Sequence, residues 1–472
     1  MSDYLYHDLE ISLREKIIRG SYPPATKLPS IRQMCLQASV SKTTVLAAYN
    51  RLEAQGLIEA RNRSGYYVRS TLNLQSSHSI SLKKPSTSKP TMTPVLISRT
   101  QVFLDIMHRG AVFDLISSAQ DIAANTQLRR CLSKGMRHQN SSQQLNYDQP
   151  RGNRELINQI CNNTNLGAGL IQAEDVIISN GCQHALLLAI IATTEPNDII
   201  AIESPAFYGA LQLIEILGRK VLEIPSSADS GLNLETLAQA AANWDIKATI
   251  VSPAFCTPTG ACMPDQNKMA LLAIAEKNSF TIIEDDIYAS LYFGFEKPRS
   301  IYSYDTQGLV ILCSSLSKSL SRDLRIGWIA SKKYSQKILA LKIATVMASS
   351  SSQQQGLSYY IKEGHLDRHL KLRRQLLESQ KNQLLTLIQQ HMSHAVSVSQ
   401  PHGGLVLWLE LNSDINTMSL YKTARAQGIT ITPGSLFSAQ NTYQSYLRIS
   451  FAQPWNEERV AAFKLLAQLT KA

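Results

Sequence analysis

Residues 309–318, LVILCSSLSK, decide the fold of the larger part of the chain. The first five are apolar and predict a buried strand, after which a polar turn places Lys318 just beyond the strand's end. A second stretch, TIIEDD at residues 281–286, ends in the same way on Asp285. Further apolar runs, DVIIS, DIIAIE and KATIVSP, alternate with helical patterns. This alternation predicts parallel strands joined by crossover helices, and therefore an α/β domain.

Lys318 and Asp285 are expected at one edge of this sheet, because the carboxyl ends of neighbouring parallel strands meet there. A lysine amine forms an imine with an aldehyde, and a carboxylate keeps a pyridine nitrogen protonated. The pair therefore suits pyridoxal phosphate. A lysine or an acid after a strand is also a common surface feature, so either residue alone is weak evidence.

Other stretches add groups suited to the same ligand. ISNGCQHALLLAII, residues 178–191, predicts a strand, a glycine turn and a helix whose first amides point at an anion. Arg325, seven residues after Lys318, offers a cationic fork to that anion. ESPAFYG supplies aromatic rings for stacking, CTPTG a hydroxyl, and Tyr288 a phenol. Each feature has a core or surface alternative, whereas their joint order favours a cofactor site.

The amino-terminal 70 residues predict a separate small domain. Leu9, Leu13 and Ile17 recur every four residues, as in an amphipathic helix. Ser30 is placed to cap a short helix, IRQMCLQA, and Ser41 to cap a second helix with an apolar inner face. This inner face comprises Val45, Ala48, Tyr49 and Leu52. The two helices form a helix-turn-helix, followed by a wing of LIEA and YYVR with Gly65 in its turn.

This domain has the charge and side chains of a DNA-binding surface. The formal charge of the chain is +11, and about +8 of it lies in residues 1–104, which indicates a polyanionic partner or an ordinary excess of basic residues. Lys42, Thr43 and Thr44 are expected on the outward first turn of the second helix, within reach of the major groove. Arg61 and Arg63 at the wing tip are expected to neutralise phosphates.

The run KLPSIRQMCLQASVSKTTVLAAYNRLEAQGLIEARNRSGYYV resembles the winged helix of GntR-type bacterial regulators. The resemblance implies that Arg32, Lys42, Thr44 and Gly65 belong to the surface that contacts DNA. Ala25 stands where that family usually has glycine before the LPS turn, a departure that alters a turn rather than a contact.

Residues 105–472 resemble the fold-type I aminotransferases. The resemblance implies that Lys318 is the Schiff-base lysine, Asp285 the partner of the pyridine nitrogen and Tyr288 the partner of the phenolic oxygen. Phe207 matches the aromatic residue that stacks on the ring. Arg448, in YLRISF, matches the arginine that clamps a substrate carboxylate.

The same resemblance implies a phosphate site and one departure. Cys182, Gln183, Ser315 and Arg325 match residues that take the phosphate. Tyr147, in YDQPRG, resembles the tyrosine that one subunit of a dimer lends to the other.

Thr257 stands where aminotransferases usually have asparagine. Threonine is shorter and has one hydroxyl, which argues against efficient transamination while leaving cofactor binding intact.

Together these matches resemble the MocR subfamily of GntR-type transcriptional regulators. The expected protein is multidomain. Residues 1–70 are a winged helix-turn-helix, mostly α with a β wing, and residues 71–104, rich in Ser, Thr, Pro and Lys, are a flexible linker or a loop lying on a neighbouring domain. Residues 105–472 are an α/β fold-type I transferase domain with a small α+β carboxyl-terminal subdomain.

The resemblance implies a homodimer that binds a double-stranded DNA operator. Its large domain is expected to sense pyridoxal 5'-phosphate, an amino acid or another amine through aldimine exchange at Lys318. Two alternatives stay open. One is a pyridoxal-phosphate-dependent aminotransferase that carries a DNA-binding head, and the other is a constitutive DNA-binding protein that the cofactor only stabilises.

Two compositional features bear on location and metals. The seven cysteines, 35, 131, 161, 182, 256, 262 and 313, are scattered and lack zinc-ligand spacing, which favours free thiols in a reducing compartment and no metal site. The amino-terminal residues include acids and no apolar signal core, and no apolar run is long enough to span a bilayer. We therefore expect a cytoplasmic protein.

Overall fold

The computed structural model describes residues 2–54, 57–61, 64–69, 92–95, 126–137, 148–164, 171–294, 296–393 and 395–471. Two predicted site residues, Arg63 and Tyr147, lie outside these ranges, as does most of the expected linker. The chain folds into two compact units, one built mainly from the amino-terminal residues and the other from most of residues 82–472. Within the expected linker, Val95 pairs with Val221 of the second unit, its backbone N–H lying 2.9 Å from that residue's carbonyl oxygen.

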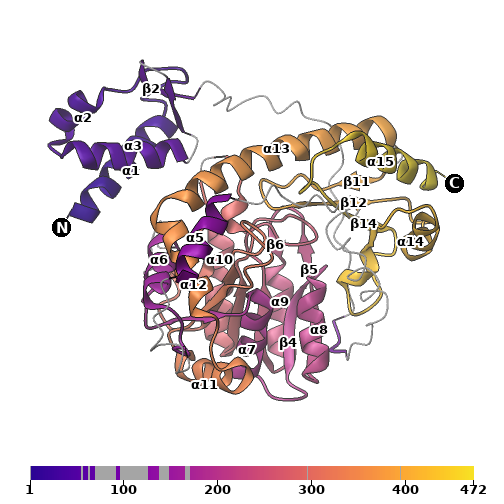
Figure 1. The fold of residues 1–472 in the computed structure, drawn as a ribbon. Coiled ribbons are helices and arrows are strands. Elements are labelled where there is room, and N and C mark those ends of the chain that lie inside the picture. The colour runs from indigo at the N-terminus through magenta and orange to yellow at the C-terminus, as the bar shows by residue number, and fades with distance from the viewer. Residues whose placement is uncertain are drawn as a thin grey trace. The chain divides into compact units, whose positions relative to one another are not determined.

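The amino-terminal unit has the predicted helix-turn-helix and wing, drawn in indigo in Figure 1. Its apolar core includes the inward residues expected from the sequence, among them Leu13, Tyr49 and Leu52. In the wing, Ile58 of one strand lies opposite Val68 of the other. The elements are α1 (Ser2–Ile18), α2 (Ile31–Ala38), α3 (Lys42–Ala54), β1 (Ile58–Arg61) and β2 (Gly65–Val68).

Side-chain caps define the two helices of the motif. Ser30 accepts a hydrogen bond from the backbone of Gln33, whose side chain accepts one from the backbone of Ser30, so that α2 begins with a capping box. Ser41 Oγ accepts a hydrogen bond from the backbone N–H of Thr44 at 3.2 Å. The hydroxyl of Tyr49 donates to the carbonyl oxygen of Pro29 at 2.7 Å, which fixes α3 against the LPS turn.

The second unit is built on a mixed sheet of eight strands in the order β3-β10-β9-β8-β7-β4-β5-β6. The strands from β9 to β5 run parallel, as the alternating pattern predicts. One strand that the pattern did not predict, β10, runs antiparallel to both β9 and β3. It does so because residues 316–326 return the chain beside β9 without a crossover helix, which a parallel neighbour would require. The strands are β3 (Val176–Ser179), β4 (Ile199–Ser204), β5 (Lys220–Ser227), β6 (Gly231–Leu232), β7 (Ile246–Val251), β8 (Thr281–Asp285), β9 (Val310–Ser315) and β10 (Gly327–Ala330).

Helices cover this sheet, and α7 packs against several of its strands. The sequence of α7, CQHALLLAIIAT, is apolar on every side, as expected of a buried helix, and it packs against β3, β8, β9 and β10. The helices of this part are α5 (Thr126–Arg137), α6 (Arg154–Thr164), α7 (Cys182–Thr193), α8 (Tyr208–Ile216), α9 (Leu234–Asn243), α10 (Asp265–Asn278), α11 (Ser335–Val346) and α12 (Ser351–Lys362). The short 3-10 helices are η3 (Ala289–Leu291) and η4 (Ile301–Tyr304).

The carboxyl-terminal part confirms the expected small α+β subdomain. Four antiparallel strands pair in the order β11-β12-β14-β13, and the long helix α13 precedes them in the chain (Figure 1). The elements are α13 (His365–His391), β11 (Ser397–Val398), β12 (Val406–Glu410), α14 (Thr417–Ala426), β13 (Thr432–Pro433), η5 (Gly434–Phe437), β14 (Tyr446–Ser450) and α15 (Glu457–Leu469).

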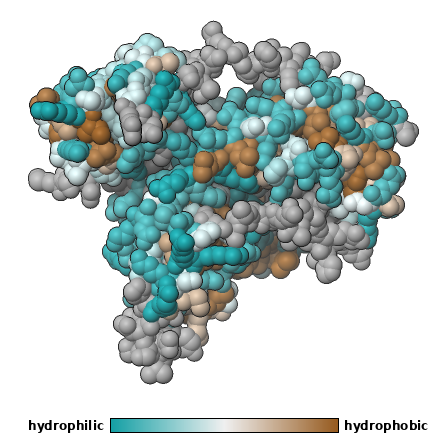
Figure 2. Space-filling model, turned by 45° about the horizontal axis from the view of Figure 1, so that its top comes forward, coloured by the Kyte–Doolittle hydropathy of each residue, from teal (hydrophilic) through white to brown (hydrophobic). Residues whose placement is uncertain are grey.

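The visible surface in Figure 2 is mostly hydrophilic, with hydrophobic side chains in separate groups. Among the helices that the structure describes, none combines the length and the apolar character needed to cross a membrane.

Candidate functional site

The sheet brings Lys318 and Asp285 to one edge, as predicted. Asp285 is the last residue of β8, and Lys318 follows β9 by three residues. β8 and β9 are parallel neighbours, with Asp285 opposite Cys313. The Asp285 side chain is buried and that of Lys318 is half-buried.

Burial perturbs both groups toward their neutral forms. It raises the pKa of Asp285 to about 6, an increase that the nearby Lys318 charge partly offsets. Burial lowers the pKa of Lys318 to about 7, and the positive charges of Arg322 and Arg448 add to this effect. A lysine amine with such a pKa is substantially unprotonated near neutral pH, and it is therefore able to attack an aldehyde.

Cys182 contacts Asp285 through its side chain, where the sequence had suggested a phosphate ligand. Its Sγ donates a hydrogen bond to Asp285 Oδ1 at 3.3 Å. Burial raises the pKa of this thiol well above its usual value, so that the thiol stays a donor. The thiol thus orients the carboxylate, and the predicted phosphate contact of Cys182 falls to its backbone N–H in the first turn of α7.

The start of α7 and Arg325, where the sequence predicts a phosphate, lie together. Gly181 precedes the helix with φ of 84°, a left-handed conformation that favours glycine, and no side chain in the described part of the chain caps the helix there. A Cβ at Gly181 would lie 3.1 Å from Arg325 Nη2, which itself donates to the carbonyl oxygen of Asn180 at 3.2 Å. The guanidinium therefore lies directly beside the free amides of the helix.

Two other predicted phosphate ligands already have partners within the protein. The side-chain amide of Gln183 donates to the carbonyl oxygen of Gly209 at 2.8 Å. Ser315 is buried, and its Oγ accepts from the backbone N–H of Ser317 at 3.3 Å while keeping its own proton to donate.

Of the groups expected around a cofactor ring, Tyr288 and Thr257 are buried and Phe207 is partly buried. The burial of Tyr288 raises the pKa of its phenol, which therefore stays a donor. The hydroxyl of Thr257 is buried and has no hydrogen-bond partner among the residues described. Phe207 immediately precedes α8, and Gly209 leaves room for its ring, since a Cβ there would lie 2.6 Å from it.

Arg448, in β14, presents a buried cation to the same region. Its Nη2 donates to Thr432 Oγ1 at 3.4 Å, and its guanidinium lies over the rings of Phe437 and Tyr208, 5.3 and 5.9 Å from their centroids. The resemblance to an arginine that clamps a substrate carboxylate predicted Arg448. It did not predict that the rings of Phe437 and Tyr208 lie against the guanidinium.

Glu203 and Arg322, near the site, were missed from the sequence, and Tyr208 was predicted only as one of the rings of ESPAFYG. Glu203, in β4, is a buried carboxylate that accepts from the backbone of Ser252 at 2.6 Å, and burial raises its pKa to about 7. Burial raises the pKa of the Tyr208 phenol, and the nearby charge of Arg448 partly offsets this rise. The charge of Arg322 helps to lower the pKa of Lys318. Glu203 stands near the end of a predicted strand, the same signal that marked Asp285.

In the amino-terminal unit, some of the predicted DNA-contacting residues are exposed and one is buried. Arg32, Lys42 and Thr43 are exposed. The expectation that Thr44 faces outward is wrong, because its side chain is buried and its Oγ1 lies 2.8 Å from Ser41 Oγ.

In the wing, Arg61, which was predicted to neutralise phosphates, already has partners within the protein. Arg61 is exposed but forms an ion pair with Glu59 at 2.8 Å and lies over the ring of Tyr67, 4.4 Å from its centroid. Gly65 has φ of 107°, as expected of a residue in the turn.

The large unit fits pyridoxal phosphate on the chemistry of its own residues. An uncapped helix start beside an arginine suits a phosphate, a buried carboxylate suits a ring nitrogen, and an unpartnered hydroxyl at Thr257 suits a polar ring substituent. Lys318 supplies the amine. The fold and the site thus define a two-part protein, a winged helix joined to a cofactor-binding domain of the aminotransferase type.

Comparisons with known proteins agree with this class. Residues 5–68 match the family of bacterial regulatory proteins, gntR family, and residues 111–463 match the family aminotransferase class I and II. The chain is 33% identical to the HTH-type transcriptional regulator YjiR and 32% identical to YdcR, both of Escherichia coli, with 98% of each chain covered in both comparisons. The kynurenine aminotransferase of Pyrococcus horikoshii has the same fold, with a TM-score of 0.72 and 24% identity over 79% of this chain and 95% of that enzyme.

The chain therefore belongs to the aminotransferase class I and II family, within the HTH-type transcriptional regulators that carry a gntR-family head, the arrangement of the MocR subfamily. That family indicates pyridoxal phosphate as the cofactor.

Proposed function

We propose that this regulator binds operator DNA as a homodimer and that its large domain senses an amino acid or another amine at Lys318. Pyridoxal phosphate, when bound, supplies an aldehyde that takes up amines. The observation that supports this proposal most strongly is that one chain carries both a gntR-family head and a half-buried Lys318 whose amine has a pKa of about 7. A lysine amine that is largely unprotonated can bond to an aldehyde, and a competing amine can then displace it from that aldehyde.

The surroundings of Lys318 favour a ligand that carries a carboxylate beside its amine. Arg448 is buried and cationic, and a buried cation is stabilised when a carboxylate pairs with it. A ligand that displaces Lys318 from the aldehyde and pairs with Arg448 changes the charge distribution at this edge of the sheet. In a homodimer such a change would alter the spacing of two heads, and operator affinity with it. A regulator that acts on chromosomal DNA would work in the cytoplasm.

The decisive experiment compares wild-type protein with Lys318→Ala. Operator DNA is first selected from a random library with the full chain, and its affinity is then measured with pyridoxal phosphate and a panel of amino acids and amines. We expect at least one ligand to change the affinity of the wild type several-fold, and no ligand to change that of Lys318→Ala. Lys337→Ala, which removes an exposed lysine in α11, is the matched control and should respond like the wild type.

Several outcomes would contradict the proposal. A wild-type affinity that no ligand changes, with cofactor-dependent melting, would indicate a constitutive DNA-binding protein that the cofactor stabilises. Steady transamination at enzyme-like rates would favour the alternative of an aminotransferase with a DNA-binding head. Lys318, Asp285 and Arg448 are the residues that such an enzyme would need. Visible spectra of wild type and Lys318→Ala identify the cofactor attachment in either case.

The DNA-binding half is tested separately at Lys42. This residue opens α3 and is exposed, and we propose that it contacts the major groove together with Arg32. Lys42→Ala should weaken operator binding by about 1–3 kcal/mol and relax sequence preference at one position. Lys16→Ala removes the same charge from an exposed position of α1 and serves as the control. Equal losses for both variants would mean that Lys42 acts only through its charge.

A further inference from the structure

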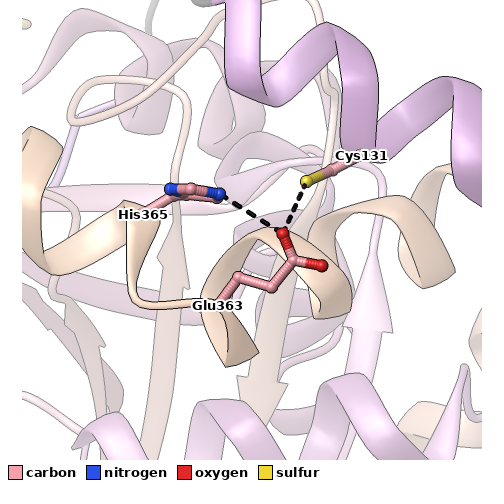
Figure 3. Close-up of side chains that lie close together, drawn as sticks. All are labelled: Cys131, Glu363 and His365. Atoms are coloured by element: carbon pink, nitrogen blue, oxygen red, sulfur yellow. Dashed lines mark hydrogen bonds and ion pairs between the residues drawn. The ribbon is translucent and has the colours of Figure 1, made fainter.

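Three side chains far apart in the sequence converge beside the turn between α12 and α13. Figure 3 shows the carboxylate of Glu363 between the thiol of Cys131, from α5, and the imidazole of His365. Cys131 Sγ lies 3.8 Å from Glu363 Oε2, and His365 Nε2 lies 3.3 Å from the same oxygen. One ligand atom from each residue lies within 4.8 Å of the other two. A thiol, an imidazole and a carboxylate form a donor set that zinc accepts.

The two oxygens of Glu363 have separate partners. Lys134, one turn after Cys131 in α5, forms an ion pair with Oε1 at 3.2 Å. This contact fixes the carboxylate so that Oε2 faces the sulfur and the nitrogen. The lysine thus acts as a supporting contact of the kind that orients a metal ligand, and it does not occupy the oxygen that the cluster shares.

The backbone around the cluster is closely packed. α5 packs against α12 at very short range, because a Cβ at Gly135 would lie 2.6 Å from the backbone nitrogen of Gly356. Gly364, between the other two ligands, has φ of 73° and joins the end of α12 to the start of α13 in a tight turn. The positions of the three side chains are therefore set by helix packing and by one left-handed turn, before any ion binds.

We propose that Cys131, Glu363 and His365 form a zinc-binding site. Bond lengths of about 2.3 Å to sulfur and about 2.1 Å to nitrogen and oxygen require ligand atoms about 3.4–3.6 Å apart around a tetrahedral ion. The distances of 3.3 and 3.8 Å to Glu363 Oε2 lie close to that range. Cys131 is 4% exposed, while Glu363 and His365 are more open, so that an ion would enter from the solvent side and keep a water as its fourth ligand.

Binding requires a defined rearrangement of protons. The thiol of Cys131 loses its proton to solvent as the sulfur–zinc bond forms, and neutral His365 binds through Nε2 with its proton on Nδ1. The ion replaces the hydrogen bonds that now lead to Glu363 Oε2. It would link α5 to the start of α13 and stabilise the contact between α5 and α12.

The test uses the full-length chain without a histidine tag and Co²⁺ as a spectroscopic substitute for zinc. Titration of the wild type should give a thiolate-to-cobalt charge-transfer band that saturates at one equivalent and that Zn²⁺ abolishes. Cys131→Ser should lose the band, and Zn²⁺ affinity should fall at least about 100-fold, beyond the range for loss of a supporting contact. Cys161→Ser, which removes another buried thiol in α6, is the matched control and should keep the band.

A second variant guards against misfolding. His365→Gln changes a side chain at the start of α13 that is 18% exposed, and it should weaken Zn²⁺ binding while leaving the melting temperature of the metal-free protein unchanged. Zn²⁺ should raise the melting temperature of the wild type and not that of either ligand variant. The proposal is overturned if the wild type shows no thiolate band, or if Cys131→Ser binds Zn²⁺ as tightly as the wild type.

Discussion

At the scale of single residues, Asp285 shows that a functional group can oppose the stability of the fold that holds it. Burial raises its pKa from the usual 3.8 to about 6. The folded state thus binds a proton more tightly than the unfolded state, and its stability falls as the pH rises from about 4 through 6. Asp285→Asn removes this cost, and we expect the cofactor-free variant to be about 2–3 kcal/mol more stable than wild type at pH 7.5.

Denaturant unfolding of both proteins at pH 4.5 and pH 7.5 measures this effect. The stability difference should be small at the lower pH and large at the higher one, and pyridoxal phosphate should bind the variant more weakly. A difference that does not depend on pH would show that the carboxylate is ionised without penalty.

Ala25 illustrates a residue whose backbone conformation suits another amino acid. Its φ is 64°, in the left-handed region, at the position where related heads usually have glycine. We expect Ala25→Gly to stabilise the amino-terminal unit by about 0.5–1 kcal/mol. Ala47→Gly, the same change inside α3, should destabilise the unit by about 1 kcal/mol. Calorimetry of the full chain should show opposite shifts, and two shifts of the same sign would refute the assignment.

At the scale of elements, the start of α7 is the part of the fold most closely tied to cofactor binding. Gly181→Ala would strain a left-handed backbone and place a methyl group against Arg325. We expect pyridoxal phosphate affinity to fall about tenfold or more, as the phosphate loses part of a charge-assisted contact.

Gly218→Ala supplies a matched control for this helix. Gly218 also has a left-handed φ, 66°, but a Cβ there would meet no atom within 4 Å. It should lose a similar amount of stability and bind the cofactor normally. Equal loss of affinity in the two variants, measured by fluorescence titration, would mean that strain and not Arg325 carries the effect.

Sequence patterns predicted these elements where local signals were sufficient. The Ser30 cap, the inner face of α3 and the strands that end near Asp285 and Lys318 all follow from periodicity and capping. The direction of β10 did not, since pairing direction depends on the path of residues 316–326. The helical pattern also missed the burial of Thr44, whose Oγ1 lies 2.8 Å from Ser41 Oγ instead of facing outward.

At the scale of the whole molecule, each compact unit has its own hydrophobic core. We therefore expect calorimetry of the full chain to show two transitions. Pyridoxal phosphate at 100 times its dissociation constant should stabilise the large unit by about 2.7 kcal/mol and leave the amino-terminal transition unchanged. Lys318→Ala should reduce the stabilisation of the large unit by pyridoxal phosphate. A single cooperative transition that the cofactor shifts as a whole would show that the units unfold together.

The sequence by itself determined the two-part organisation, the winged helix and the residues at the ends of β8 and β9, because these features rest on patterns between near neighbours in the chain. Only the tertiary structure decided that Cys182 orients Asp285, that Gln183 is held by Gly209, and that Cys131 meets Glu363 and His365. The cysteine spacing had predicted no metal site, because such spacing records only ligands that lie near one another in the chain. Cys131 and Glu363 are 232 positions apart. Side chains so distant in sequence meet only through the packing of α5 against α12, which no local pattern records.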